Sequence, residues 1–446
     1  MQCMVTTIIS RQSRLGNGRD NCTKQRQSAS KVIILLLIAV SIVPGAPNSA
    51  SVPYLFVLKS SVRCQAREVN VEAHATIPRR SETIRAFKGS GGLAAAVLPI
   101  HYPRALLRAF DVLPVEVWGP PGVDASFGAA HLQPYVCSIV RNALSFLQSG
   151  GLDVVDLILV PHACDSLQGL GSILIDFVHP KQPVIPLYLP RGTRESDVGF
   201  LADELRSLYR RLAEVTHHSP SDAQLAQSIQ REETADQFLS GLDQSRQQLS
   251  LTQIGFYRLV RSREYLPAEI FSDLAQSALG RALSPPPTPL PRRTTGEGEL
   301  RQGVPILLSG IVPEPMSLFE SIAEMGGVVV ADDLACCGRR VYPPGKSDEP
   351  FRRMAESLLA APPDPMRGSP IRKRLEHLLQ LCKTSGAKGV VFYDVKFCEP
   401  ELYDLPNLRK GLQEAGVPSV AIEVDLNDPL SHQTLTRIEA FLEMIA

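Results

Sequence analysis

Signatures of several large protein classes are missing from this sequence. It has no Gly-x-x-x-x-Gly-Lys-Ser/Thr phosphate-binding loop. Gly89, Gly91 and Gly92 precede a predicted strand instead of following one, which is the wrong context for a dinucleotide-binding fingerprint. The 46 Lys and Arg residues balance 46 Asp and Glu residues, so no net charge favours binding to nucleic acid. These absences disfavour a self-contained ATPase, an NAD enzyme and a nucleic-acid-binding protein.

Cysteine is also sparse. Nine cysteines in 446 residues, at irregular spacings, do not form the disulfide framework of a small secreted domain. With 44% hydrophobic residues the chain can bury a large core, and its length predicts two or three domains. Each cysteine is therefore expected to be a free thiol or a ligand.

The N-terminal 85 residues differ from the rest of the chain. Residues 1–31 contain six basic side chains and one acidic one, and the apolar run Val32–Val43 follows them. This order is typical of a signal peptide, although the run is short for a membrane span. It indicates a cleaved leader, a short anchor or a stretch that is not part of the protein. We expect residues 1–85 to lie outside the fold.

From about residue 92, short β-branched runs alternate with helical segments, as in parallel α/β layers. In the first half, strands are predicted at Ala94–Ile100, Pro114–Trp118, Val154–Val160 and Pro183–Leu189. Helices are predicted at Arg104–Phe110, Pro134–Leu147 and Glu195–Val215, followed by a polar helical stretch from Ser219 to Gln248.

Five prolines between residues 285 and 291 exclude a helix or a central strand from residues 284–301, where we predict a domain boundary. In the second half, strands are predicted at Val304–Leu308, Gly327–Ala331, Gly389–Tyr393 and Ser419–Val424. Helices are predicted from Met316 and at Arg352–Ala360, Ile371–Thr384, Leu405–Ala415 and Ser431–Ile445. The sequence thus predicts an α/β protein of two doubly wound parallel-sheet domains, residues 86–283 with a helical insertion and residues 302–446.

Three cysteines lie at the edges of predicted elements, where loops of an α/β fold converge. Cys137 opens a helix, Cys164 follows the strand Val154–Val160, and Cys398 follows the strand Gly389–Tyr393. The intervals between them resemble neither zinc nor ferredoxin spacings. Taken singly, a cysteine is more often a small buried hydrophobe than a ligand. Spacing alone therefore leaves both interpretations open.

The residues around these cysteines carry more information. In chain order they read YVCSIVRNAL, LILVPHACDSLQGL, PLYLPRG, GVVFYDVKFCEPELYDLPNL, GVPSVAIEVD and QTLTRIEAFLEMI. From about residue 92 to the C-terminus the chain resembles the 2-hydroxyacyl-CoA dehydratase and benzoyl-CoA reductase family, in particular the D-component type of 2-hydroxyglutaryl-CoA dehydratase subunit. The combination of Cys-Asp, Lys-Phe-Cys and Thr-Arg-Ile-Glu-Ala-Phe is specific.

The resemblance implies that Cys137, Cys164 and Cys398 bind a [4Fe–4S] cluster between the two halves, with one iron lacking a protein thiolate. It also implies a dehydratase subunit: one electron converts a 2-hydroxyacyl-CoA thioester into a ketyl radical anion, the 2-hydroxyl leaves, and loss of a β-proton gives a 2-enoyl-CoA. The implied partners are the acyl-CoA substrate, a homologous second subunit and a separate ATP-dependent iron–sulfur activator. The implied location is a reducing cytoplasm, which disagrees with the signal-like N-terminus.

Two related functions stay open on the sequence. A benzoyl-CoA reductase-type subunit uses the same cluster to consume electrons on an aromatic ring. A non-catalytic iron–sulfur paralogue has no acyl-CoA pocket, and Arg104 and Asp111 favour it because relatives usually have an acidic residue and a glycine there. A soluble α/β protein without a cluster is a third alternative, and it requires the three cysteines to lie far apart.

Other side chains are weaker candidates. His162 and Glu399 are candidates for proton transfer, but a loop histidine and a helix-capping carboxylate are the ordinary interpretations of such residues. Cys336 and Cys337 are candidates for a fourth ligand or a redox pair, against simple packing.

Overall fold

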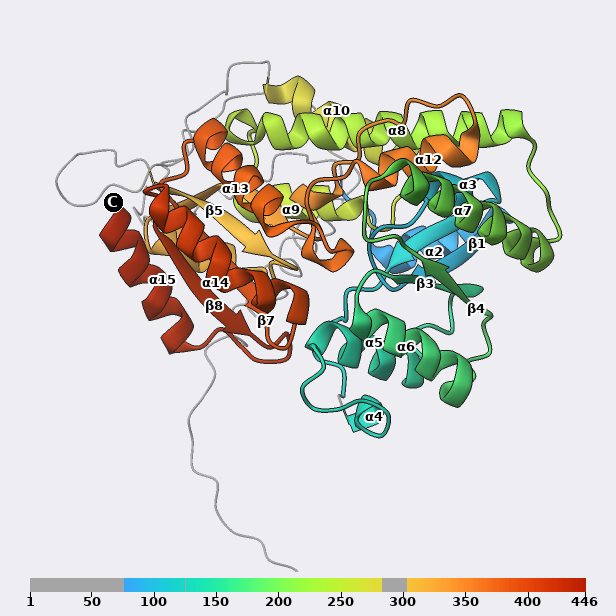
Figure 1. Cartoon of the computed structure of the whole chain (residues 1–446), viewed down its shortest axis with the longest axis horizontal. Coiled ribbons are helices and arrows are strands. Elements are labelled where there is room, and N and C mark those ends of the chain that lie inside the picture. Colours follow the sequence, from blue (N-terminus) through green and yellow to red (C-terminus); the bar gives the residue numbers. More distant parts are fainter. Residues whose placement is uncertain (1–75, 125, 283–302) are drawn as a thin grey trace, which may run out of the picture. The chain divides into compact units, whose positions relative to one another are not determined.

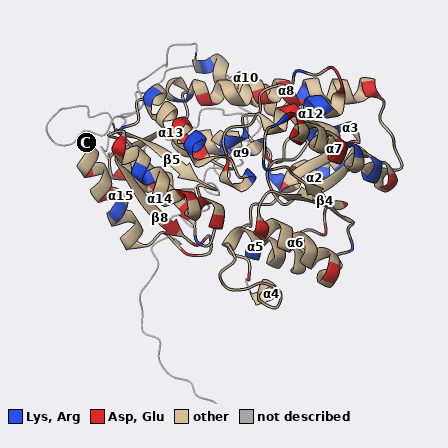
Figure 2. Cartoon of the chain, in the orientation of Figure 1, with Lys and Arg blue, Asp and Glu red and all other residues tan. Residues whose placement is uncertain are grey.

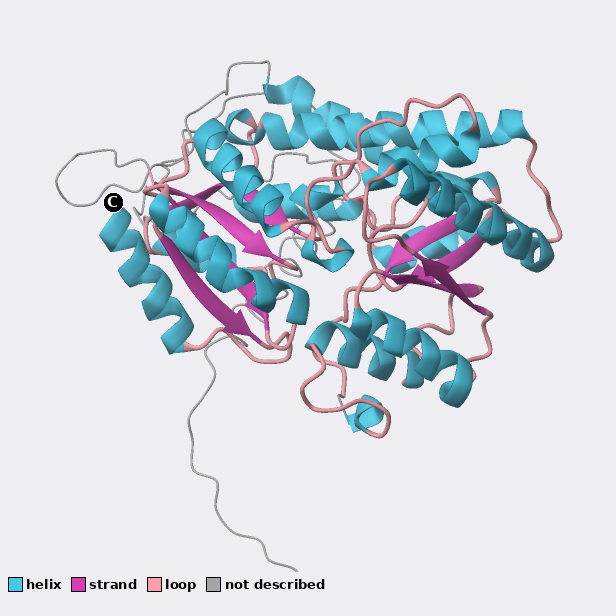
Figure 3. Ribbon diagram, viewed as in Figure 1, coloured by secondary structure: helices cyan, strands magenta, loops and turns pink. Residues whose placement is uncertain are grey.

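The computed structural model describes residues 76–124, 126–282 and 303–446. The signal-like segment and the proline-rich residues 284–301 lie outside the described residues. Two sheets of four parallel strands, flanked by helices, confirm the predicted α/β class with two doubly wound sheets (Figures 1 and 3). Both sheets belong to the same compact unit of the chain. No helix in the described part of the chain combines the length and the apolarity needed to cross a membrane.

The first sheet has the strand order β2-β1-β3-β4. Its strands are β1 (Leu93–Val97), β2 (Val112–Glu116), β3 (Leu157–His162) and β4 (Val184–Tyr188). The helices of this half are α3 (Arg104–Ala109), α4 (Ser126–Ala129), α5 (Ser138–Gln148), α6 (Asp165–Ile173) and α7 (Glu195–Thr216). Nearly every residue of β1, β2 and β3 is buried, as expected for parallel strands covered by helices on both faces.

The second sheet repeats this order as β6-β5-β7-β8. Its strands are β5 (Val304–Gly310), β6 (Gly327–Leu334), β7 (Gly389–Val395) and β8 (Ser419–Val424). Its helices are α11 (Ser317–Glu324), α13 (Ile371–Ser385), α14 (Glu399–Glu414) and α15 (His432–Ile445). The order in which strands are added to each sheet reverses between β1 and β3 and between β5 and β7. Such topological switch points are where α/β sheets bind ligands.

Of the helices of the predicted insertion, the first packs on α3, the last packs on the first, and the middle one contacts the last and also α11 of the second sheet. In chain order these helices are α8 (Asp222–Gln244), α9 (Gln253–Ser262) and α10 (Ala268–Ala282). Helix α12 (Pro350–Leu359) precedes β7 in the sequence but packs against α7 (Figure 1). A single hydrophobic core contains Ile158 of β3 and Val391 of β7, so the two sheets share buried apolar side chains.

Several element boundaries shift by a few residues from the sequence prediction, and two departures are larger. Helix α2 (Arg80–Gly89) crosses residue 85, and Arg80 Nη2 lies 2.5 Å from Glu264 Oε2, so the fold begins earlier than expected. Helix α14 begins at Glu399 and not at Leu405, and Pro406 lies inside the helix and not in its first turn. Pro400 fits the first turn of α14, where a backbone N–H has no helical partner and a proline costs little.

The two departures from the family pattern have local structural explanations. Asp111 has a left-handed backbone, with φ of 54°. Glycine adopts this conformation most easily, which explains why the resemblance places a glycine here, and aspartate also tolerates it. Arg104 is buried, and its Nη1 donates to Glu116 Oε1 and to the Tyr102 hydroxyl, each at 2.8 Å. Both residues therefore fit the fold without reference to a substrate pocket.

Candidate functional site

Each of the three predicted ligand cysteines is the N-cap residue of a helix. Cys137 caps α5, Cys164 caps α6 after β3, and Cys398 caps α14 after β7. Because β3 and β7 are the strands next to the two switch points, the sheet order brings Cys164 and Cys398 to corresponding positions in the two halves. The N-terminal end of a helix carries partial positive charge, which favours a thiolate there.

The three thiols lie close enough to affect one another electrostatically. Burial raises the pKa of Cys137, and it raises the pKa of Cys164 to about 12 with a further contribution from Cys137. Burial and the neighbouring Cys137 and Cys164 raise the pKa of Cys398 well above its usual range. All three are free cysteines. The arrangement in which the three cysteines lie far apart, which a cluster-free protein required, is therefore not the one observed.

Three thiols are a donor set of the kind that iron–sulfur clusters use. Among the described residues, no three His, Cys, Asp or Glu side chains lie close enough together to hold one metal ion. A single ion needs its ligands to converge on one centre, whereas a four-iron cluster takes each thiolate on a different iron. The raised pKa values favour protonated thiols, so a metal that bound them would displace protons.

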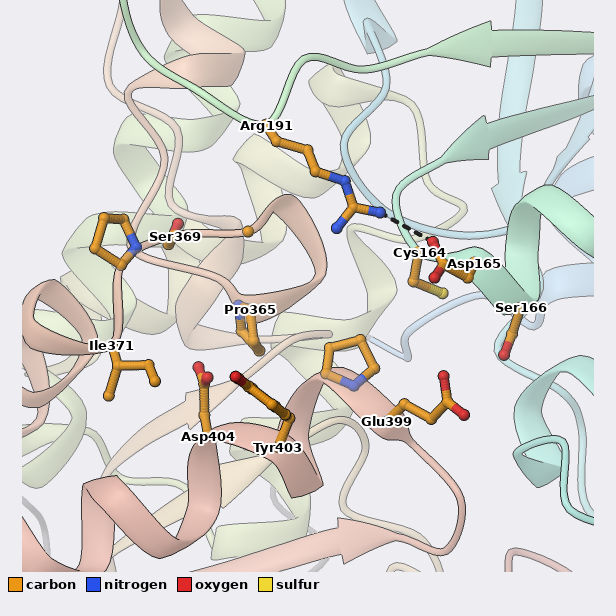
Figure 4. Close-up of a pocket in the computed structure, with 13 residues that line it drawn as sticks. Cys164, Asp165, Ser166, Arg191, Pro365, Ser369, Ile371, Glu399, Tyr403 and Asp404 are labelled. Atoms are coloured by element: carbon orange, nitrogen blue, oxygen red, sulfur yellow. Dashed lines mark hydrogen bonds and ion pairs between the residues drawn. The ribbon is translucent and has the colours of Figure 1, made fainter.

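A cavity of about 420 Å³ opens beside Cys164. The first half contributes the N-terminus of α6 and Arg191, which follows β4. The second half contributes the loop before α13 and the first turns of α14, including Tyr403 (Figure 4). The cavity therefore joins segments that lie up to about 240 residues apart around one of the three cysteines.

The two proton-transfer candidates have different environments. Glu399 lines the cavity at the first position of α14. His162 is not among the lining residues, and its ring packs edge-on against Tyr188 with the ring centroids 4.7 Å apart. Burial lowers the pKa of His162, and both ring nitrogens are buried without a hydrogen-bond partner in the described part of the chain. Of the two, only Glu399 faces the cavity.

Cys336 and Cys337 lie after β6, with their sulfur atoms 3.4 Å apart. Both are buried in the hydrophobic core, and neither lines the cavity. Burial and the Cys336 thiol raise the pKa of Cys337 well above its usual range. Their surroundings are those of packed core side chains.

Residues 99–445 match the family described as 2-hydroxyglutaryl-CoA dehydratase, D-component. The chain belongs to this family. The resemblance seen in the sequence is therefore confirmed over most of the chain's length.

Curated relatives of this D-component family member have similar lengths. The (R)-phenyllactyl-CoA dehydratase beta subunit of Clostridium sporogenes is 24% identical over 361 residues, which cover 80% of this chain and 92% of the relative. The lactoyl-CoA dehydratase subunit beta of Anaerotignum propionicum is 24% identical, with coverage of 83% and 96%. A benzoyl-CoA reductase subunit of Thauera aromatica is 25% identical, with coverage of 74% and 84%.

A buried ion network beneath α14 was not anticipated from the sequence. Arg374 of α13 donates to Glu401 Oε2 and to Asp404 Oδ2, each at 3.0 Å. Arg339 donates to both oxygens of Asp333 at 3.1 and 2.9 Å, and it also donates to Glu401. Glu401 and Asp404 lie in the first two turns of the helix that Cys398 caps. The network therefore fixes α14, and with it Cys398, against α13 and β6.

A second buried pair holds the cavity wall. His101 lies beyond β1, and its Nε2 is 3.0 Å from Asp364 Oδ2. Ile100 and His101 both have left-handed backbones, with φ of 70° and 57°, which is unusual for non-glycine residues. Asp364 accepts from the Met366 backbone N–H at 2.8 Å, and the next residue, Pro365, lines the cavity. The end of β1 thus braces a wall that belongs to the second half.

Stability should fall in mild acid because of His101. Burial lowers the pKa of His101, so its neutral imidazole donates to Asp364. Burial alone would raise the pKa of Asp364, but the hydrogen bond from His101 and the charge of Arg339 keep that pKa below its usual value. The unfolded histidine takes up a proton below about pH 6.5 and the folded one does not, so the free energy of unfolding decreases as pH falls.

Denaturant unfolding at about pH 7.5 and about pH 5.5 tests this prediction. The wild type should lose about 1 kcal/mol more than His101→Gln over this interval. Equal losses in the two proteins would show that His101 titrates normally in the fold.

Proposed function

We propose that this chain is the iron–sulfur subunit of a 2-hydroxyacyl-CoA dehydratase, which eliminates water from a 2-hydroxyacyl-CoA to give a 2-enoyl-CoA. The observation that carries the proposal is that Cys137, Cys164 and Cys398, each at a helix N-terminus, lie close enough to affect one another electrostatically, and that Cys164 lines a cavity. The names of the relatives support it, since two of them are beta subunits of lactoyl-CoA and phenyllactyl-CoA dehydratases.

In this proposal the three cysteines hold a [4Fe–4S] cluster as thiolates. When bound, the cluster would supply single electrons and one iron without a protein thiolate. The chain's own contribution is to place the thiolates at three positive helix ends and to bury Cys137 and Cys398 away from water.

The cavity would take the acyl part of the substrate. Its volume of about 420 Å³ is in the range of small-molecule sites and suits an acyl group with part of the pantetheine arm. The hydroxyls of Ser166, Ser369 and Tyr403 line it and can donate hydrogen bonds to the thioester. The Glu399 carboxylate, which also lines the cavity, would accept the β-proton.

A second subunit would cover exposed aromatic side chains of the segment that carries Cys137. Phe127, Tyr135 and Phe177 are exposed. They belong to the segment from α4 to the turn after α6, which carries few charged side chains (Figure 2). Exposed aromatic side chains on a charge-poor surface are typical of protein interfaces. Because the sequence has no phosphate-binding loop, ATP-driven reduction would come from the separate iron–sulfur activator.

A benzoyl-CoA reductase-type subunit is the second candidate, because one relative is a benzoyl-CoA reductase subunit that is 25% identical over 343 residues. Electron stoichiometry separates the two functions. We expect the chain, copurified anaerobically with its partner subunit and activated by a limiting amount of reductant, to form many molecules of 2-enoyl-CoA per electron. Product that never exceeds the electrons supplied would contradict the dehydratase proposal and favour the reductase.

A further inference from the structure

Arg191 is the one cationic side chain among the described residues that line the cavity. It follows β4, and its Nη2 donates to Asp165 Oδ1 at 2.9 Å. Its remaining guanidinium nitrogens make no other hydrogen bond within the part of the chain that the structure describes. Figure 4 shows the guanidinium group between the cavity and the loop that carries Cys164. Arg191 therefore has hydrogen-bond donors to offer to a ligand.

The stem and the head of this side chain have different surroundings. A Cβ added to Gly368 would lie 3.4 Å from the Arg191 Cβ, so the stem of Arg191 lies beside the second half of the chain. The head is exposed: the side chains of Arg191 and Asp165 are 64% and 79% accessible. Exposed ion pairs of this kind contribute little to stability. A ligand anion can therefore replace Asp165 at little cost.

The other acidic side chains of the cavity strengthen this assignment. Glu399 and Asp404 also line it, so a ligand anion would be repelled unless a cation received it. Arg374 already binds Asp404, and Arg374 is fully buried and does not line the cavity. Arg191 is left as the receiving cation, and a guanidinium binds carboxylate or phosphate through two parallel hydrogen bonds.

We propose that Arg191 is the anion-binding residue of this cavity and that it binds a carboxylate or phosphate oxygen of the acyl-CoA thioester in place of Asp165. The inference rests on the proposed function and adds the residue that recognises the substrate's charge. Asp165 is then a competitor of the ligand. If the ion pair only held the two loops together, loss of either partner would weaken ligand binding equally.

The test compares Arg191→Gln with Asp165→Asn in the full chain purified anaerobically, using equilibrium binding of acyl thioesters. Arg191→Gln should weaken binding ~10–100-fold, the range for a hydrogen bond to a charged group. Asp165→Asn should tighten binding ~2–5-fold, because a weak competing pair is removed. Arg191→Lys keeps the charge but not the paired guanidinium donors, so its affinity should lie between those of the wild type and Arg191→Gln.

Arg194→Gln is the matched control. Arg194 lies three residues away, is exposed and pairs with Asp197 of its own helix. It does not line the cavity, so this variant should bind as the wild type does. Iron content is measured on every variant, so that loss of the cluster is distinguished from loss of the anion site.

Four probes identify the anion: 2-hydroxyglutaryl-CoA, lactoyl-CoA and the pantetheine thioesters of the same two acids. If Arg191→Gln weakens only the two 2-hydroxyglutaryl thioesters, Arg191 binds the acyl carboxylate. If it weakens only the two CoA esters, Arg191 binds a CoA phosphate. Either result supports the proposal.

Three results would overturn it. Unchanged binding of all four probes by Arg191→Gln, or equal weakening by Arg191→Gln and Asp165→Asn, would remove the anion site and leave the dehydratase proposal standing. Iron-loaded wild type that binds no acyl thioester would overturn both, and would favour the non-catalytic paralogue.

Discussion

Cys398→Ala, Cys164→Ala and Cys137→Ala should each lose the cluster and all dehydratase activity. Removal of one thiolate leaves two protein ligands for a cluster that otherwise has three, and the raised pKa values of the remaining thiols oppose their ionisation without iron. Iron content should fall from about four atoms per chain to less than about one. The measurement is iron and acid-labile sulfide per chain after anaerobic purification.

Cys382→Ala is the control for this series. Cys382 is a free, buried cysteine on α13, in a core cluster that contains none of the three ligand candidates. Its loss should leave iron content unchanged and cost about 1 kcal/mol of stability from the small cavity. A Cys398→Ala protein that keeps a full complement of iron would exclude Cys398 as a ligand.

Arg374→Met should destabilise the fold more than other arginine substitutions on the same helix. The Arg374 side chain is fully buried, and it donates to Glu401 and Asp404 beneath the helix that Cys398 caps. Loss of the arginine leaves buried carboxylates without the positive charge that pairs with them, which costs about 3–5 kcal/mol of stability. The midpoint and slope of urea unfolding measure the change.

Arg372→Met provides the comparison two residues away. The side chain of Arg372 is 83% exposed and lies 3.5 Å from Glu376, so its removal should cost less than about 1 kcal/mol. Because the network fixes the first turns of α14, Arg374→Met should also bind less iron than Arg372→Met. Similar unfolding midpoints for the two variants would contradict the role given to the buried network.

Much of the fold was predictable from the sequence because its strands are buried and β-branched. The predicted strand Ser419–Val424 has the same bounds as β8, and the predicted helix Glu195–Val215 is one residue shorter than α7. The start of α14 was missed because a proline usually marks a helix end or a first turn. Pro406 was therefore assigned to the first turn, although the helix already begins at Glu399. The packing of α12 on α7 was missed because sequence periodicity does not show which sheet a helix covers.

The site was only partly predictable. Cys137, Cys164 and Cys398 were identified through the family strings around them, since their spacing carries no metal signature. Their convergence follows from the order of the strands in two sheets, which sequence periodicity does not determine. The His101–Asp364 pair joins residues 263 positions apart. The role proposed for Arg191 depends on the cavity that it lines. Such pairs leave no local pattern.

Iron and acid-labile sulfide content of the anaerobically purified full chain, with electron paramagnetic resonance of the reduced protein, tests the central claim most directly. About four irons and four sulfides per chain, with a paramagnetic signal on one-electron reduction, is the expected result for one [4Fe–4S] cluster. A folded chain that binds no iron after anaerobic purification and reconstitution would contradict the cluster and the dehydratase function built on it.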